Sequence, residues 1–226
     1  MPDRLGVIIV AAGSGIRMDG IDKLFTPIGG TAVLARAIAP FQQSKLVDSI
    51  VLVVSEENVE RAKEMVERAG FDKIGIVRAG GARRQDSVSN GLDALGKCDF
   101  VAVHDGCRPI VQPDLIERGL AAAREHGAAV PGLRLTETLK ETDEDGDVVR
   151  TVDRLQLHAI QTPQIFRREL LARAHREVTA DVTDDAAMLE TIGVPVRVFA
   201  GSRANVKITT AEDIELVAAM MAASAR

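Results

Sequence analysis

The stretch LGVIIVAAGSGIRMDGIDKL, residues 5–24, joins an apolar run to a loop that contains glycines and cations. The run LGVIIVAA is rich in Val and Ile and too short for a typical helix, so it predicts a buried β-strand. The loop after it holds Gly13, Gly15, Arg17 and Lys23. Glycines let a backbone present its N–H groups to a ligand, and the two cations can neutralise negative charge. The stretch therefore predicts a strand followed by a polyphosphate-binding loop.

The same strand pattern recurs along the first half of the chain, and segments with helical spacing separate the copies. Because parallel strands need long crossovers, this alternation predicts an α/β fold with a mostly parallel sheet covered by helices. Ligands bind such sheets at the carboxyl ends of the strands. The further strands are expected at SIVLVVS (49–55), IGIVRAG (74–80) and FVAVHD (100–105), all as buried strands, and the helices at residues 31–43, 57–70 and 83–95; the pattern continues through residues 113–129.

The pattern changes at Leu133. Two semi-alternating runs flank DEDGD (143–147), which predicts a β-hairpin whose acidic tip forms the turn. An isolated two-stranded ribbon is marginal in water, so we expect this arm, at about residues 134–156, to pack on a second subunit.

We expect the remaining segments to belong to one domain, at residues 1–226, with no linker, repeat or fused second enzyme. A last helix is expected from about Ala211, with Thr210 and Asp213 as a capping box. Further helices are expected at residues 168–178 and 183–193, and a strand at 194–202.

Composition narrows the class of protein. The net charge of −5 and the absence of Trp and Tyr argue against nucleic-acid binding. Two cysteines are too few for a disulfide framework, which favours a reducing, cytoplasmic compartment. The chain shows neither a membrane span nor a signal-peptide layout, so we expect a soluble cytoplasmic protein.

Two familiar phosphate-binding motifs do not fit the loop. A Walker A motif needs a Gly-Lys pair followed by Ser or Thr, whereas Gly20 is followed by Ile21. A dinucleotide fingerprint needs a glycine where Met18 stands. A plain glycine turn with two solvent-facing cations stays open as the alternative.

Asp105 and Arg108 directly follow a predicted strand, in VHDGCRP (103–109). A single aspartate at that edge can hold Mg²⁺, because this ion fills its other positions with water and substrate phosphates. The alternative is that Asp105 only forms a turn. His104 is expected to be a packed strand-end residue.

The stretch GGARRQDSVSNGL (80–92) places Gly81, Arg84 and Ser87 where a strand ends and a helix begins. Free amides and polar side chains there could read a base or a ribose. A capped helix with exposed arginines is an equally good interpretation.

Seven segments in this order resemble the 2-C-methyl-D-erythritol 4-phosphate cytidylyltransferase family, over nearly the whole chain. They are AAGSGIRM (11–18) with Lys23, GGARRQDSVSNGL, VHDGCRP, TVDR (151–154), TPQ (162–164), TDDA (183–186) and NVKIT (205–209). The resemblance implies a Rossmann-like nucleotidyltransferase fold, CTP and a sugar-alcohol phosphate as substrates, Mg²⁺ as cofactor, a homodimer joined through the arm, and a role in isoprenoid precursor synthesis by the non-mevalonate pathway.

The resemblance also implies a role for individual residues. Those implied as catalytic are Arg17, Lys23 and Lys207. Those implied as CTP-binding are Ala11, Ala12, Gly13, Ser14, Gly15, Gly81, Arg84, Ser87, Asp105 and Gly106. Those implied as acceptor-binding are Asp105, Arg108, Thr138, Arg154, Thr162 and Lys207, with Asp105 also on the metal side and some contacts supplied by the partner subunit.

The sequence departs from the family at a few positions, since HDGCRP stands where HDAARP is usual. The charged groups are retained, so base contacts and affinity are affected more than the type of reaction. A ribitol 5-phosphate cytidylyltransferase and a non-catalytic nucleotide-binding regulator on the same fold stay open as alternatives.

Overall fold

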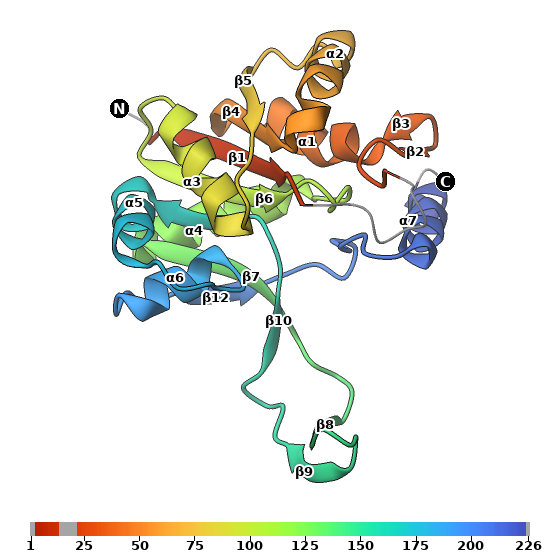
Figure 1. Ribbon diagram of the computed structural model, residues 1–226, viewed down its shortest axis with the longest axis vertical. Helices are drawn as coiled ribbons and strands as arrows, with labels where there is room; N and C mark the ends of the chain where they lie inside the picture. The colour runs from red at the N-terminus through yellow and green to blue at the C-terminus, as the bar shows by residue number, and fades with distance from the viewer. Residues whose placement is uncertain (1–2, 14–21, 225–226) are drawn as a thin grey trace.

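The predicted first strand forms the centre of the sheet. In the computed structural model, which describes residues 3–13 and 22–224, β1 (Leu5–Ala11) pairs in parallel with β4 (Val47–Val54) and with β6 (Phe100–Asp105). β5 (Ile74–Ala79) continues the parallel order beyond β4. Strong apolar runs thus occupy the middle of the sheet, where both faces are covered (Figure 1).

The other half of the sheet is mixed. β11 (Gln164–Arg167) is antiparallel to both β6 and β7 (Ala128–Arg134). β7 also pairs with β10 (His158–Ile160) in antiparallel and with β12 (Arg197–Ala200) in parallel orientation. The expected α/β class with a mostly parallel sheet is confirmed, and the strand order is β10-β7-β11-β6-β1-β4-β5 with β12 beside β7.

Helices cover both faces because the chain changes direction within the sheet. The crossovers from β1 to β4 and from β4 to β5 run one way, whereas the crossover from β5 to β6 runs back. Right-handed connections then put their helices on opposite faces. One face carries α1 (Val33–Gln43), α2 (Val59–Ala69, preceded by a 3₁₀ turn at Glu56–Asn58) and α4 (Pro113–His126); the other carries α3 (Arg84–Ala94), α5 (Arg168–Glu177) and α6 (Asp185–Thr191).

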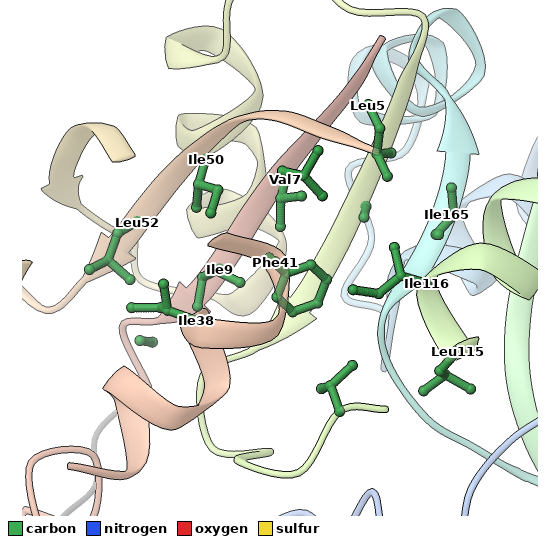
Figure 2. Packing of buried hydrophobic residues seen from close by; sticks show 14 of the residues in the cluster. Leu5, Val7, Ile9, Ile38, Phe41, Ile50, Leu52, Leu115, Ile116 and Ile165 are labelled. Atoms are coloured by element: carbon green, nitrogen blue, oxygen red, sulfur yellow. The ribbon is translucent and has the colours of Figure 1, made fainter. Parts of the chain in front are cut away.

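The alternation of side chains along β1 builds both halves of the core. Leu5, Val7 and Ile9 pack against α1 and α4, and Ile8 and Val10 face α3 and α5. Figure 2 shows the first group gathered with Ile38 and Phe41 of α1. The aliphatic core that the composition implies is therefore arranged as two layers around one sheet.

The arm has the predicted hairpin. β8 (Leu139–Thr142) and β9 (Val148–Val152) are antiparallel, and Gly146 in the tip has a φ of 89°, a left-handed conformation that glycine adopts readily. The arm projects away from the sheet (Figure 1), and its residues are largely exposed.

The last helix, α7 (Ala211–Ser224), begins as predicted and packs near β2 (Pro27–Ile28), which pairs with β3 (Thr31–Ala32). The Asp213 carboxylate accepts hydrogen bonds from the backbone N–H groups of Thr209 and Thr210, as a capping aspartate does. Within residues 3–13 and 22–224, no helix combines the length and the apolar character that crossing a membrane requires.

Some sequence-based expectations were wrong. The segment 74–80 was expected to be a buried strand, but β5 lies at the sheet edge and Ile76 is 42% exposed. The break in the pattern comes slightly earlier than residue 129, since α4 ends at His126 and Ala128 begins β7. Strands β7, β10 and β11 were not predicted. The alanines, glycine and proline of β7 (AAVPGLR) carry little strand signal, and β10 and β11 have only three and four residues.

Candidate active site

A cavity of about 570 Å³ lies where β1, β5 and β6 end. The chain moves from β1 to β4 and β5 on one side and returns to β6 on the other, which separates the helices and leaves a crevice at the carboxyl ends. The cavity therefore lies at the carboxyl ends of the strands, where the sequence analysis predicted ligand binding. Its described lining comprises Val10, Ala11, Ala12, Gly13, Lys23, Leu24, Gly81, Ala82, Arg83, Arg84, Ser87, Asp105, Cys107, Lys207 and Thr209.

The two ends of the glycine-rich loop reach the cavity. Ala11, Ala12 and Gly13 line it from the end of β1, and Lys23 lines it where the loop returns. A turn holds Lys23 in place, since the Asp22 carboxylate accepts the Leu24 N–H at 3.2 Å. The predicted loop residues Ser14, Gly15 and Arg17 lie outside the described residues.

The second wall comes from the turn between β5 and α3. Oγ of Ser87 accepts the Gly81 N–H at 3.1 Å and lies 3.2 Å from the Arg83 carbonyl oxygen, to which it can donate. The hydroxyl thus holds the glycine backbone against the first turn of the helix. Gly81, Arg84 and Ser87 were predicted from the sequence, and all line the cavity.

Asp105 is the centre of a cluster of charges. Its Oδ1 lies 3.3 Å from Nε of Arg84, and its Oδ2 lies 3.2 Å from Nζ of Lys207 and 3.5 Å from Nε of Arg108. Burial alone would raise the pKa of Asp105, but the three cations outweigh burial and hold the pKa well below its ordinary value. The carboxylate is ionised, and the cluster of four side chains carries a net positive charge.

Thr162 is held from both sides. Nε2 of His104 lies 3.2 Å from the Arg108 carbonyl oxygen, which can only accept, so Nε2 carries the proton. Nδ1 then accepts the Thr162 hydroxyl proton at 2.9 Å, and Oγ1 of Thr162 accepts the Asp105 N–H at 3.1 Å. Burial lowers the pKa of His104 to about 4, which agrees with a neutral ring. His104 is the packed residue that the sequence suggested, and it orients Thr162 beside Asp105.

Asn205 braces the side of the site that carries Arg108. Its carbonyl oxygen accepts from Nη1 of Arg108 at 2.9 Å, and its side-chain Nδ2 donates to the Thr162 carbonyl oxygen at 2.7 Å. Gln161 donates to the same Asn205 carbonyl at 3.3 Å. The hydrogen bonds of Asn205 therefore anchor the NVKIT segment, which places Lys207 beside Asp105.

The other predicted residues lie away from the cavity lining. Gly106 is buried, its N–H donates to the Val10 carbonyl at 2.8 Å, and an added Cβ would lie 2.9 Å from Leu34, so its visible role is packing. Thr138 and Arg154 are exposed on the arm. No described contact brings these two to Asp105, and their roles remain predictions.

The donor set decides how a metal could bind here. Within the described chain, no group of three or more His, Cys, Asp or Glu is placed to hold an ion. Asp105 supplies the one carboxylate of the described cavity lining, and it already faces three cations. The site fits Mg²⁺ only where phosphate oxygens of a nucleotide supply the remaining negative charge.

Sequence reasoning missed two buried polar residues that support the site. Asn205 is fully buried, and Asp185 is 1% exposed and pairs with Arg84. Both stand in TDDA and NVKIT, two segments that carried the family resemblance. Their place in these segments is the sequence feature that could have identified them as site residues.

Comparisons with known proteins agree with this geometry. The family model for 2-C-methyl-D-erythritol 4-phosphate cytidylyltransferase (IspD) matches residues 5–223. A relative of that name from Dehalococcoides mccartyi is 44% identical over 212 residues, which cover 94% of this chain and 93% of the relative. Another from Symbiobacterium thermophilum is 42% identical over 98% of this chain and 94% of the relative.

A solved structure supports the same assignment. The 4-diphosphocytidyl-2C-methyl-D-erythritol synthase from Anaerococcus prevotii superposes with a TM-score of 0.86 at 30% identity, and the match covers 98% of this chain and 100% of that chain. Sequence, fold and site agree, and the chain belongs to the 2-C-methyl-D-erythritol 4-phosphate cytidylyltransferase family.

Proposed function

We propose that this enzyme transfers a cytidylyl group from CTP to 2-C-methyl-D-erythritol 4-phosphate, giving 4-diphosphocytidyl-2-C-methyl-D-erythritol and pyrophosphate for isoprenoid synthesis by the non-mevalonate pathway. The observation that carries the proposal is the convergence of Arg84, Arg108 and Lys207 on Asp105 at the carboxyl end of β6. Such a cluster is suited to bringing together two phosphorylated molecules that repel each other.

In this mechanism a phosphate oxygen of the acceptor attacks the α-phosphorus of CTP in line. A new P–O bond forms as the bond from the α-phosphorus to the bridging oxygen breaks, and pyrophosphate leaves. The acceptor phosphate is already an anion at neutral pH, so the step needs no general base. This fits a site whose buried histidine, His104, is neutral and engaged with Thr162.

The protein's contribution is positioning and charge neutralisation. Lys23, with Arg17 from the undescribed part of the loop, would stabilise the charge on the α-phosphoryl group and the leaving pyrophosphate. Arg108 and Lys207 would face the acceptor phosphate. The backbone at Ala11 to Gly13 and at Gly81 would hold the nucleotide.

Mg²⁺ is part of the proposal. Asp105 is the residue that would hold the ion, and the chemistry supplied there would be Lewis-acid neutralisation of phosphate charge.

We also propose a cytoplasmic homodimer joined through the arm. In the single chain, large apolar side chains on the arm are exposed, including Val149 at 60% and Leu155 at 67%. Exposed apolar side chains close together are typical of an interaction surface. Arg154, next to Leu155, would then reach the acceptor site of the partner subunit.

The decisive experiment offers the purified protein each nucleoside triphosphate, Mg²⁺, and either methylerythritol phosphate or ribitol 5-phosphate, and follows pyrophosphate release. We expect pyrophosphate release only with the pair CTP and methylerythritol phosphate. Release with ribitol 5-phosphate instead would identify the other acceptor, and CTP binding without turnover would identify a regulator.

A further inference from the structure

Asp185, the second aspartate of the TDDA segment, is a buried partner of Arg84. It is the first residue of α6 and only 1% exposed. Its Oδ2 lies 2.7 Å from Nη1 of Arg84. On the other side, Oδ1 lies 3.8 Å from Nε2 of His175, beyond hydrogen-bonding distance. Among the described residues, the short contact of Asp185 is therefore the one to Arg84.

Arg84 connects this buried carboxylate to the cavity. Its Nη1 contacts Asp185 of α6, and its Nε contacts Asp105 at the end of β6, at 3.3 Å. A guanidinium is planar and rigid, so fixing Nη1 also fixes the direction of Nε. The Arg84 side chain is 27% exposed and lines the cavity, whereas Asp185 is almost fully buried, so Arg84 is the contact through which we expect Asp185 to affect a ligand.

Charge keeps the bridge in place. Burial would raise the pKa of Asp185, yet the nearby Arg84 and His175 outweigh burial and lower it, so the carboxylate is ionised. The two carboxylates together raise the pKa of Arg84 against the effect of burial. Without Asp185, the guanidinium would keep a single partner, Asp105, and could rotate with that carboxylate.

We propose that Asp185 is a positioning residue for cytidylyl transfer, which holds Arg84 so that Arg84 and Asp105 keep fixed orientations at the nucleotide side of the cavity. The inference rests on the proposed function. Arg108, in contrast, is held separately by the Asn205 carbonyl. Loss of Asp185 should therefore affect the nucleotide more than the acceptor.

The first test is Asp185→Asn in the full-length enzyme. We expect the KM for CTP to rise about tenfold or more and kcat to fall, with a change of less than about threefold in the KM for the acceptor. The matched control is Asp184→Asn. Asp184 caps the same helix and accepts a hydrogen bond from Gln164 at 2.7 Å, and no described contact joins it to Arg84. This variant should therefore lower stability without raising the KM for CTP more than the KM for the acceptor. The proposal would be overturned if both variants raised the KM for CTP relative to the KM for the acceptor to the same extent.

A double-mutant cycle with Arg84→Gln tests whether Asp185 acts through Arg84. If Asp185 acts through Arg84, then Asp185→Asn should change kcat/KM by less than about twofold in the Arg84→Gln background. An effect as large as in the wild-type background would show that Asp185 acts by another path. The double variant carries a neutral pair. Where Asp185→Asn alone does not fold, the comparison of Arg84→Gln with the double variant still tests the proposal, since a change in kcat/KM well above about twofold would overturn it.

A readout without turnover separates this inference from the proposed function. The Arg84 Nε–H signal, assigned by its loss in Arg84→Gln, should exchange slowly with solvent in the wild type and at least about tenfold faster in Asp185→Asn. Unchanged exchange would overturn the positioning role. Failure of pyrophosphate release by the wild type would overturn the proposed function and leave this measurement valid.

Discussion

Gly80 and Ser87 approach so closely that a Cβ added at Gly80 would lie 2.5 Å from Oγ of Ser87. Gly80→Ala should therefore displace the wall formed by Gly81 and Ser87, raise the KM for CTP about tenfold and destabilise the protein by about 1–3 kcal/mol. Kinetics and thermal unfolding check both effects. Gly96→Ala is the control, because nothing lies within 4 Å of a Cβ there. Wild-type kinetics for Gly80→Ala would contradict this role.

Lys23→Ala should reduce turnover by about 10²-fold or more, because removing one charge-stabilising donor has effects of this size. The side chain lines the cavity, so the fold and the melting temperature should change little. Steady-state kinetics and circular dichroism test this. The exposed Lys97→Ala serves as control, and near-normal turnover of Lys23→Ala would refute the assignment.

Arg154→Ala should raise the KM for the acceptor far more than the KM for CTP, provided that the dimer persists. The control on the same arm is Arg150→Ala, which removes an exposed ion pair to Glu141 at 2.6 Å and should change stability by no more than about 1 kcal/mol. Equal effects of Arg154→Ala on the two KM values would count against an acceptor role.

Leu155→Glu should shift the protein from dimer to monomer, because it places a charge in an apolar contact that the arm is proposed to form. Light scattering coupled to size-exclusion chromatography measures the change. Ile76→Glu, on the edge strand β5 and 42% exposed, is the control for charge at an exposed apolar position. A Leu155→Glu protein that remained dimeric would argue against this part of the interface.

Protonation of His104 should make folding stability depend on pH between about 4 and 6.5. Burial lowers the pKa of His104 from 6.5 to about 4, so in this window the unfolded chain binds more protons than the folded one. The free energy of unfolding should therefore decrease as the pH falls, by up to about 3 kcal/mol from this group. The lowered pKa values of Asp105 and Asp185 act at lower pH, outside this window.

Urea unfolding of the wild type and of His104→Gln at pH 7 and pH 4.5 measures this dependence. The variant should be less stable at pH 7, since it loses the bond to Thr162 at 2.9 Å, but should lose less stability on acidification. An equal loss in both proteins would mean that other groups cause the dependence.

Much of the fold follows from local pattern. The runs that became β1, β4 and β6 are apolar enough to be recognised as strands, and Gly70 ends a helix that its spacing predicts. Strands made of small residues, such as β7, form because a neighbouring strand supplies the hydrogen bonds. Their sequences carry little sign of this.

The candidate site divides in the same way. The amino-acid sequence by itself determined which chemistry-bearing groups stand at the end of a strand or in the segment that follows it, among them Lys23, Gly81 and Asp105, and strand order then brings them together at the carboxyl ends of the strands. Only the tertiary structure decided which partners they meet. Asp185 lies 101 residues from Arg84, and Asn205 lies 97 from Arg108. Such contacts depend on burial in a shared environment, where an ionised or polar group must find a partner, and no local pattern encodes that pairing.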